Sequence, residues 1–383
     1  MVVLSIDLLV SPFLIYWYML VSMNAMPTPP TLAGSYLVLE TTNKCSLACQ
    51  HCSISELGHP HHQRVGFIDP SLVRRLFDNL VESRAYFDTL IMFWLGEPLI
   101  HPKFSEIYEM AVEINREHRV FGKIELHTNA THLDDVAIDV ALNNSSVEQV
   151  WHFSLDAATR DTYLQIKGRD RFFDVERNLA KLVERKGSSG ASNPRIVFQY
   201  IVSSSNSDEA SAFMRRWSMV CNRAGVPVRA SAQHVPHGDD AIIFFKQLDC
   251  PTPEIQNKEN KIFRQTMRRL GLPLEQENSV QSTVVAENLN PCSGFWKSPV
   301  VSWDGDLMVC TRDNLHSNSI GNLAESSFSD LWWGAEMRTR RGEVACGDYS
   351  GLDLCATCFI PRSSNYIGIS QAEISRHDAW RPM

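Results

Sequence analysis

The chain has 383 residues, of which 44% are apolar and 21% are charged, a composition typical of a folded globular protein. A net charge of −8 argues against a protein that binds nucleic acid through a basic surface. The 10 cysteines are too sparse for a disulfide scaffold, and they indicate metal or redox chemistry in a reducing compartment, the cytoplasm.

Residues 1–34 are expected to form an N-terminal extension. Within it, Leu8–Val21 is largely apolar, but it contains Pro12 and is shorter than the roughly 20 residues of a membrane-spanning helix. A membrane partner is therefore not expected, although a membrane-associated segment is the alternative. We expect translation to start at one of three methionines that precede a proline-containing stretch, namely Met19, Met23 or Met26.

Strands and helices are predicted to alternate from residue 35 onward. The apolar patterns predict strands at Ser35–Glu40, Thr89–Leu95, Lys123–His127, Gln149–Leu155, Arg195–Val202 and Val226–Ala232. Helices are predicted at Ser71–Tyr86, Ser105–Glu117, Asp134–Leu142, Val175–Arg185 and Asp208–Ala224. This alternation predicts an α/β fold over residues 35–240, either a doubly wound sheet or a full or partial barrel. In a barrel, the active site lies at the C-terminal ends of the strands.

The remainder of the chain divides into three predicted parts. Residues 241–289 are rich in polar side chains and prolines, which predicts a linker with a helix at Asn260–Leu270. Residues 290–362 form a smaller cysteine-rich unit, expected to be an α+β domain, and residues 363–383 form a C-terminal tail.

Three cysteines lie together just after the first predicted strand. Cys45, Cys49 and Cys52 have the spacing C-x3-C-x2-C, and disulfide pairing would leave at least one of them needing a distant partner. Ligation of a metal or cluster explains the spacing directly, because thiolates from one loop can converge on one centre. A structural zinc site with His51 or His59 as its fourth ligand is the alternative.

The segment Leu37–Cys52, which contains these cysteines, resembles the signature of radical S-adenosylmethionine (radical SAM) enzymes. Three further segments resemble motifs of that family in the expected order: Gly96-Glu97-Pro98, His127-Thr128-Asn129-Ala130 and Phe153-Ser154-Leu155-Asp156. The resemblance implies a partial (β/α)6 TIM-like barrel.

The resemblance also implies a set of cofactor contacts. Cys45, Cys49 and Cys52 would bind three irons of a 4Fe–4S cluster, whose fourth iron would chelate SAM. Further contacts with SAM are implied for Gly96, Glu97 and Pro98 at its amino group, Ser154 at its carboxylate, the backbone near His51 at adenine, and Asn129 in the pocket. Lys167 and Arg169 are two alternatives for a basic partner of the carboxylate.

The C-terminal unit resembles a SPASM or twitch domain, which carries an auxiliary cluster. Cys292, Cys310, Cys355 and Cys358 would hold a second 4Fe–4S cluster, and a closed four-thiolate zinc site is the alternative. Cys346 is a fifth thiol that would either join the ligand set or act as a hydrogen donor. A full SPASM domain carries seven cysteines and two auxiliary clusters, so the five found here indicate a single cluster.

The resemblance as a whole implies a radical SAM oxidoreductase. Such an enzyme reductively cleaves SAM to a 5′-deoxyadenosyl radical and abstracts hydrogen from its substrate. We expect a peptide or a small molecule such as a sugar or aminocyclitol, undergoing oxidation, crosslinking, epimerisation or dehydration. A flavodoxin-type or ferredoxin-type protein would donate the electron, and no specific nucleic-acid partner is expected. The alternative is a noncatalytic zinc or iron–sulfur binding module.

Overall fold

The computed structural model describes residues 32–52, 55, 64–233, 241–250, 252–274, 291–362, 366 and 368–379. Three predictions lie outside these residues: the N-terminal extension up to residue 31, His59 as a zinc ligand, and the part of the linker after residue 274. Among the described helices, none combines the length and the apolar character that crossing a lipid bilayer requires.

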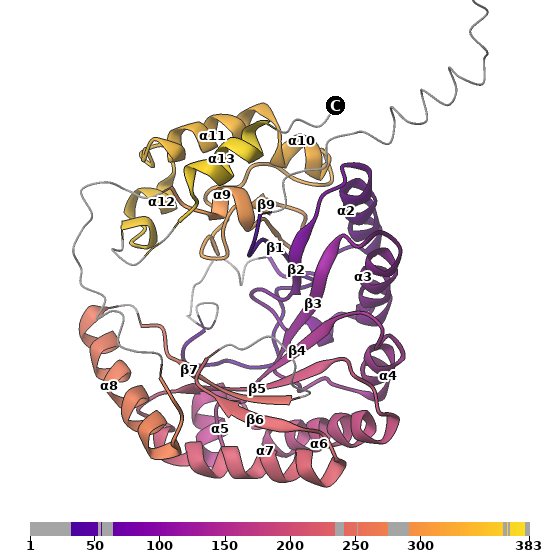
Figure 1. The fold of residues 1–383 in the computed structure, drawn as a ribbon, viewed down its shortest axis with the longest axis vertical. Helices are drawn as coiled ribbons and strands as arrows, with labels where there is room; N and C mark the ends of the chain where they lie inside the picture. Colours follow the sequence, from indigo (N-terminus) through magenta and orange to yellow (C-terminus); the bar gives the residue numbers. More distant parts are fainter. Residues whose placement is uncertain are drawn as a thin grey trace, which may run out of the picture.

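One sheet of nine strands organises the fold, in the order β6-β7-β5-β4-β3-β2-β1-β8-β9. The strands are β1 (Tyr36–Leu39), β2 (Phe87–Met92), β3 (Phe121–Thr128), β4 (Gln149–Ser154), β5 (Arg195–Val202), β6 (Val228–Ser231), β7 (Ala241–Gln247), β8 (Val300–Val301) and β9 (Leu307–Met308). All neighbours from β6 to β8 are parallel, and only β9 is antiparallel to its partner. Figure 1 shows the sheet curving like an open barrel.

The larger helices cover the outer, convex face of this sheet (Figure 1). They are α2 (Pro70–Glu82), α3 (Phe104–His118), α4 (Asp135–Asn143), α5 (Arg160–Lys167), α6 (Phe172–Ser189), α7 (Ala210–Ala224) and α8 (Pro253–Leu270). The C-terminal unit adds α9 (Gly294–Lys297), α10 (Phe328–Trp332), α11 (Ala335–Ala345), α12 (Asp353–Thr357) and α13 (Gln371–Ala379). Short 3-10 turns are η3 (Pro98–Ile100), η4 (Ser207–Glu209) and η5 (Ile360–Arg362).

Helix α2 illustrates how the sequence specifies these elements. The carboxylate of Asp69 accepts a hydrogen bond from the backbone N–H of Ser71, which caps the helix, and Pro70 suits its first turn. Leu72, Leu76 and Leu80 recur every four residues, so they share one face and are all buried. This buried face attaches α2 to the sheet and forms part of the main core.

Strand β7 is the main departure from the sequence prediction, which placed residue 241 at the start of the linker. Ala241–Gln247 instead inserts between β5 and β6 and pairs in parallel with both. Ile243 and Phe245 pack in the main core, while Ile242 and Phe244 are buried on the opposite face. A strand covered on both faces is apolar throughout and shows no alternation, which explains why the sequence pattern missed it.

Three helices also differ from their predicted extents. Helix α5 was not predicted, and α8 begins at Pro253, well before the predicted Asn260. Helix α6 runs from Phe172 to Ser189 and so extends beyond both ends of the predicted Val175–Arg185. Residue 187 is a glycine within that helix because there is no space for a side chain: a Cβ there would lie 2.0 Å from the carbonyl oxygen of Ala224.

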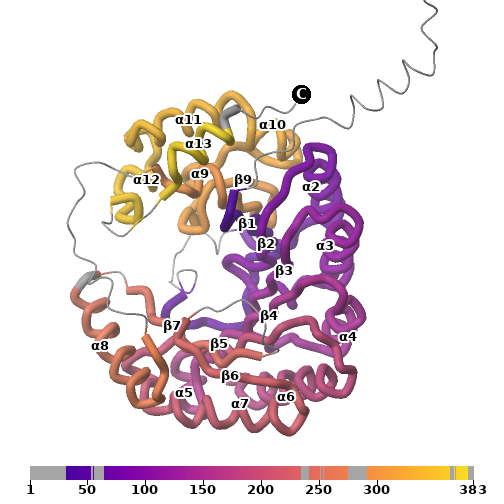
Figure 2. The backbone as a smooth tube through the Cα atoms, in the orientation of Figure 1, coloured from indigo at the N-terminus to yellow at the C-terminus, as the bar shows by residue number. Residues whose placement is uncertain are grey.

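The C-terminal unit is joined to the barrel through the sheet itself. Strand β8 pairs with β1, so residues about 260 positions apart in the sequence lie side by side in the sheet (Figure 2). At the same junction, the ring of Phe328 packs edge-on against Phe87, and the N–H of Ser329 donates to the Asn79 side chain. The predicted tail contributes α13, which is held by an ion pair of 2.8 Å between Lys297 and Glu373.

Candidate active site

The loop that follows β1 carries three reduced cysteines, Cys45, Cys49 and Cys52, all of them half-buried. Helix α5 holds this loop in place, because the N–H of Ala48 donates to the carbonyl of Lys167 and the N–H of Gln50 donates to that of Ile166. The loop therefore lies at the C-terminal edge of the parallel strands, where barrel enzymes place their active sites.

The environment of these thiols suits a metal centre. Burial raises the pKa of Cys45 to about 12, and it also raises that of Cys49. Free thiols here would therefore stay protonated, whereas a bound metal deprotonates a coordinating thiol outright. Three closely spaced thiols from one loop fit three of the four irons of a cubane cluster.

The Gly96-Glu97-Pro98 segment packs directly beneath the cysteine loop. A Cβ on Gly96 would lie 2.1 Å from the carbonyl oxygen of Thr42 and 2.7 Å from that of Lys44, so only glycine fits. The N–H of Glu97 also donates to the carbonyl of Lys44, at 2.7 Å. These contacts fix the position of the cysteine loop relative to the C-terminal ends of β2 and β3.

Both carboxylate oxygens of Glu97 accept hydrogen bonds from neighbouring protein groups. Its carboxylate accepts hydrogen bonds from the Thr128 hydroxyl at 2.6 Å, the Asn129 N–H at 2.7 Å and the Leu99 N–H at 3.0 Å. Burial raises the pKa of Glu97 to about 7, although these bonds oppose the shift. The structure thus gives Glu97 a positioning role, and a contact with SAM from this segment stays a prediction for its backbone.

Asn129 links the end of β3 to the cysteine loop. Its side-chain Nδ2 lies 3.7 Å from the Sγ of Cys45, and its Oδ1 accepts from the N–H and hydroxyl of Thr131. The Thr131 hydroxyl in turn lies 2.7 Å from that of Ser46. Asn129 therefore lies beside the cysteine loop, and its contact with SAM stays a prediction.

A buried ion pair lies beneath the same loop. The ammonium of Lys167 lies 2.6 Å from Oδ2 of Asp156, and both side chains are almost fully buried. Burial alone would lower the pKa of Lys167, but the charge and hydrogen bond of Asp156, together with the neighbouring Cys49 and Cys45, outweigh it, so the pKa is raised. Of the two predicted partners for the SAM carboxylate, Lys167 is thus already paired with Asp156 and Arg169 is exposed.

Ser154 and His51 are the two remaining residues that are predicted to contact SAM. Ser154 ends β4 half-buried, and its hydroxyl accepts a hydrogen bond of 3.2 Å from the Gln199 side chain on β5. His51 is exposed on the cysteine loop. Neither residue belongs to the buried core, and their contacts with SAM stay predictions.

The second group of cysteines surrounds one cavity in the C-terminal unit. Cys292, Cys310, Cys355 and Cys358 all line a space of about 300 Å³. Their sulfurs are also approached by donors: the Tyr366 hydroxyl at 3.7 Å from Cys292, the Arg312 N–H at 3.4 Å from Cys310, and the Asn318 amide at 3.8 Å from Cys355. Four thiols facing one cavity fit a second cluster, and hydrogen bonds to sulfur are one means of tuning its potential.

Cys346 lies apart from this cavity. It is exposed at the C-terminal end of α11 and is not one of the residues that line the space. The expectation that it joins the ligand set or donates hydrogen to a substrate therefore gains no support from its position, and we leave it out of the site.

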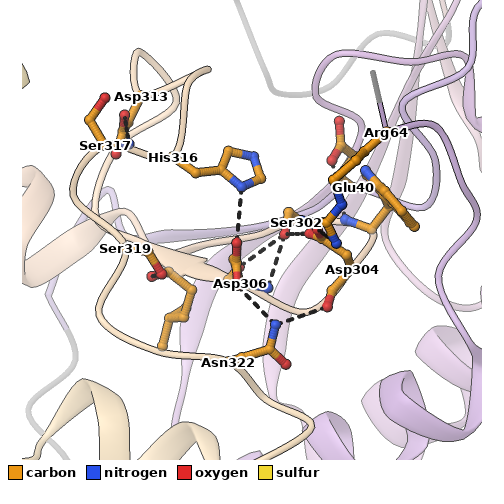
Figure 3. A network of polar contacts seen from close by, with 12 residues as sticks. Glu40, Arg64, Ser302, Asp304, Asp306, Asp313, His316, Ser317, Ser319 and Asn322 are labelled. Carbon is orange, nitrogen blue, oxygen red and sulfur yellow. Dashed lines mark hydrogen bonds and ion pairs between the residues drawn. The ribbon is translucent and has the colours of Figure 1, made fainter. Parts of the chain in front are cut away.

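A polar network that sequence reasoning missed joins the segment after the cysteine loop to the C-terminal unit (Figure 3). Arg64, just after the cysteine loop, pairs with Asp304 at 3.0 Å, and Asp306 accepts from Asn322 at 2.9 Å and contacts His316 at 3.1 Å. Arg64 and Asp304 are 240 residues apart, so no local sequence signal predicts their pairing.

Glu40, which directly follows β1, is buried where the barrel meets the C-terminal unit. Its carboxylate accepts from the N–H groups of Leu95 at 3.3 Å and Trp303 at 3.2 Å, which joins β1 to both β2 and the C-terminal unit. Burial raises the pKa of Glu40 to about 7. Trp94 adds a bond of 2.9 Å to the carbonyl of Thr311, next to Cys310. The two cysteine sites therefore belong to one connected structure.

Two family models match the chain. The radical SAM superfamily matches residues 39–198, and an iron–sulfur cluster-binding domain, SPASM, matches residues 292–359. The chain is a radical SAM enzyme with a C-terminal SPASM domain. The predicted family, its 4Fe–4S and SAM cofactors and the additional iron–sulfur binding of the SPASM domain are thereby confirmed. This also sets aside the alternative of a noncatalytic module.

Curated relatives agree with this family. The "tungsten-containing aldehyde ferredoxin oxidoreductase cofactor-modifying protein" of Pyrococcus furiosus is 24% identical over 339 residues, which cover 84% of this chain and 88% of that protein. The GTP 3′,8-cyclase of Chlorobaculum tepidum is 26% identical over 151 residues, covering 39% of this chain and 41% of the cyclase.

Solved structures confirm the fold. The structure of anSMEcpe with bound AdoMet has a TM-score of 0.52 at 14% identity, and the match covers 91% of this radical SAM enzyme and 96% of that chain. Streptococcus suis SuiB bound to its precursor peptide SuiA has a TM-score of 0.51 at 12% identity, covering 88% and 73%. The predicted α/β architecture with a mostly parallel sheet is therefore confirmed.

Proposed function

We propose that this enzyme is an oxidoreductase that removes a hydrogen atom from a small polar molecule held on the concave face of the barrel. The observation that carries the proposal is the convergence of the Cys45–Cys52 loop with Asn129 and the Asp156–Lys167 pair at the C-terminal edge of the sheet. When bound there, the cluster supplies the electron that cleaves SAM to methionine and a 5′-deoxyadenosyl radical.

The chain's own residues would position the cofactors. Cys45, Cys49 and Cys52 would hold the cluster, while Glu97 fixes the end of β3 beneath it through Thr128 and Asn129. The exposed His51 on the loop and the half-buried Ser154 at the end of β4 would contact SAM. The rigid contacts of Gly96 with the loop support a fixed geometry for this pocket, which radical chemistry requires to exclude side reactions.

A cluster held by the second group of cysteines would accept the electron left on the substrate radical after hydrogen abstraction. Cys292, Cys310, Cys355 and Cys358 provide four thiolates for one auxiliary cluster, which leaves no ligand position open for SAM there. Glu40 and Trp94 connect this site directly to the barrel. An electron acceptor beside the substrate chamber favours a net two-electron oxidation over a redox-neutral rearrangement.

We favour a small polar substrate, such as a sugar-like or cofactor-like molecule, over a peptide. The concave face of the sheet carries the polar side chains of Glu125, His127 and His152, with apolar residues such as Val197 and Phe244 beside them. Such a mixed, largely buried lining suits a compact molecule. The Pyrococcus furiosus relative is by name a cofactor-modifying protein, whereas the SuiB structure contains a precursor peptide, so a peptide is the outcome that would revise this part.

The electron would come from a flavodoxin-type or ferredoxin-type protein in the cytoplasm. Reduced, metal-binding cysteines are maintained in reducing compartments, and all ten cysteines are free in this structure. The Cys45–Cys52 loop is half-buried, so a donor would have to transfer its electron through a thin layer of protein. Reduction of the reconstituted enzyme by a purified ferredoxin, in place of dithionite, tests this assignment.

Anaerobic reconstitution tests the proposed function. Protein loaded with iron and sulfide should contain about eight irons per chain, for two 4Fe–4S clusters, and should form 5′-deoxyadenosine from SAM after reduction. The Cys49→Ala variant is the matched control and should lose 5′-deoxyadenosine formation while keeping the auxiliary iron. Fully loaded wild-type protein that never forms 5′-deoxyadenosine would overturn the proposal.

A substrate screen then separates the two classes of substrate. Small polar molecules and unstructured peptides are added to the reduced enzyme with SAM, and the rate of 5′-deoxyadenosine formation is measured. A deuterium-labelled small molecule that stimulates the rate and transfers deuterium from one of its C–D bonds into 5′-deoxyadenosine supports our assignment. Stimulation and deuterium transfer by peptides alone would replace it with a peptide-modifying function.

A further inference from the structure

Four polar side chains lie together on the concave face of the barrel. Lys123, Glu125 and His127 alternate along β3, so they share one face of the strand. The intervening residues Ile124 and Leu126 are in the main core on the helix side. His152 of β4 is paired directly with His127 in the parallel register. All four side chains therefore face the inside of the barrel, below the cysteine loop.

The donor atoms of three of these residues converge. Oε2 of Glu125 lies 3.2 Å from Nε2 of His127 and 3.7 Å from Nε2 of His152. One ligand atom from each of the three residues lies within 4.8 Å of the others. In a tetrahedral zinc site with bonds of about 2.0–2.2 Å, neighbouring ligand atoms lie about 3.4 Å apart. The two distances from Oε2 of Glu125, 3.2 and 3.7 Å, lie just below and just above this ligand–ligand distance. One cation therefore fits between the three donors.

Lys123 fixes the carboxylate in the orientation that a metal requires. Its Nζ lies 2.6 Å from Oε1 of Glu125, which leaves Oε2 directed at the two imidazoles. Ligating carboxylates are commonly held by such an outer partner.

The surroundings leave one side of this group accessible. The His127 side chain is 28% exposed, and the Phe93 ring stacks on it with centroids 5.5 Å apart. Asn129, two residues further along β3, contacts Cys45 at 3.7 Å. With a strand rise of about 3.3 Å per residue, the three-residue group lies about 7 Å along the strand from the level of the cysteine loop. A molecule bound there would lie within the chamber that faces SAM.

We propose that Glu125, His127 and His152 bind a zinc ion, and that its fourth coordination position binds an oxygen atom of the substrate. Structural zinc sites are closed by four protein ligands, whereas catalytic sites have three ligands and an open position. Among the described residues, no fourth histidine, cysteine or carboxylate belongs to this group. The zinc site goes beyond the proposed function and depends on it only for the identity of the substrate.

Zinc binding to the full-length, iron-loaded enzyme tests the proposal, because the clusters then occupy both groups of cysteines. Zn²⁺ is added, excess metal is removed on a chelating resin, and zinc and iron are counted by mass spectrometry. We expect about one zinc per chain, with a zinc X-ray absorption spectrum showing nitrogen and oxygen ligands and imidazole scattering. An absence of retained zinc, or a shell dominated by sulfur, would overturn the proposal.

Two substitutions and one control locate the ion. His127→Gln should remove the stoichiometric zinc, and Lys123→Met should weaken its affinity by about 10- to 100-fold through loss of the outer partner. His132→Gln, at an exposed histidine on the loop after β3, should bind zinc like the wild type. Unchanged affinity in both test variants contradicts the site. Circular dichroism and iron content verify that each variant is folded.

The same samples distinguish this inference from the proposed function. Wild-type enzyme that forms 5′-deoxyadenosine but retains no zinc overturns the zinc site alone. Wild-type enzyme that retains histidine-bound zinc but never cleaves SAM overturns the proposed oxidoreductase activity and leaves the metal site standing.

Discussion

The Nζ atom of Lys167 lies 2.6 Å from Oδ2 of Asp156, with side-chain exposures of 3% and 1%, directly beneath the loop that carries Cys49. The other carboxylate oxygen of Asp156 accepts the N–H of Ile201 on β5, at 2.7 Å. The pair therefore ties together β4, β5 and α5, the helix that holds the cysteine loop. Because both charges are removed from water, losing one partner leaves the other uncompensated.

Removal of one partner should strongly destabilise the fold. We expect Asp156→Asn to lower the free energy of unfolding by about 3–5 kcal/mol, because it leaves a buried ammonium without its counter-ion. The double variant Asp156→Asn/Lys167→Met should recover part of this loss. Urea unfolding of the iron-free protein measures both. Arg160→Ala, which breaks an exposed ion pair with Asp170, is the control and should have little effect. Equal losses in the single and double variants would contradict this account.

Glu40 should make stability depend on pH. Its pKa is about 7 in the folded state against an ordinary value of 4.5, so between these values the folded state binds more protons than the unfolded state. The free energy of unfolding should therefore fall as the pH rises from about 4.5 to 7, by up to about 3 kcal/mol from this group.

The Glu40→Gln variant should flatten this dependence, since glutamine does not titrate. Urea unfolding at several pH values between 4.5 and 8 measures the slope for each variant. Glu109→Gln, at an exposed position on α3, should keep the wild-type slope. A wild-type slope in Glu40→Gln would show that other groups cause the pH dependence.

Gly96 should be intolerant of even one added methyl group. A Cβ would lie 2.1 Å from the carbonyl oxygen of Thr42, a backbone atom that cannot move without displacing the cysteine loop. We expect Gly96→Ala to reduce iron loading at the first cluster and to abolish SAM cleavage. Gly342→Ala, in α11, has nothing within 4 Å of its Cβ and should be neutral or stabilising by up to about 1 kcal/mol. Normal iron loading and SAM cleavage in Gly96→Ala would refute the steric argument.

The auxiliary site should depend on four of the five C-terminal cysteines. Cys358→Ala removes a thiol that lines the 300 Å³ cavity, and we expect it to lose about four irons per chain while the first cluster stays loaded. Cys346→Ala alters an exposed thiol outside the cavity and should keep the full iron content. Iron analysis with electron paramagnetic resonance of the reduced clusters distinguishes the two sites. A loss of iron in Cys346→Ala would return that residue to the ligand set.

The sequence by itself determined the local chemistry. The spacing of Cys45, Cys49 and Cys52 predicts a shared centre, because thiols within eight residues can converge without help from the rest of the fold. The order of the short motifs at Gly96, Asn129 and Ser154 placed them at successive strand ends, since parallel strands bring their C-terminal ends to one edge. These inferences need only chain geometry and strand direction.

Tertiary structure alone decided which distant groups meet. The pairing of Asp156 with Lys167 depends on α5 folding back under the cysteine loop, and the pairing of Arg64 with Asp304 depends on β8 docking beside β1. The two-residue alternation puts Glu125 and His127 on one face of β3, but the register in which β4 pairs with β3 is what brings His152 beside His127. Contacts between segments far apart in sequence are set by how the elements pack, and no local pattern carries that information.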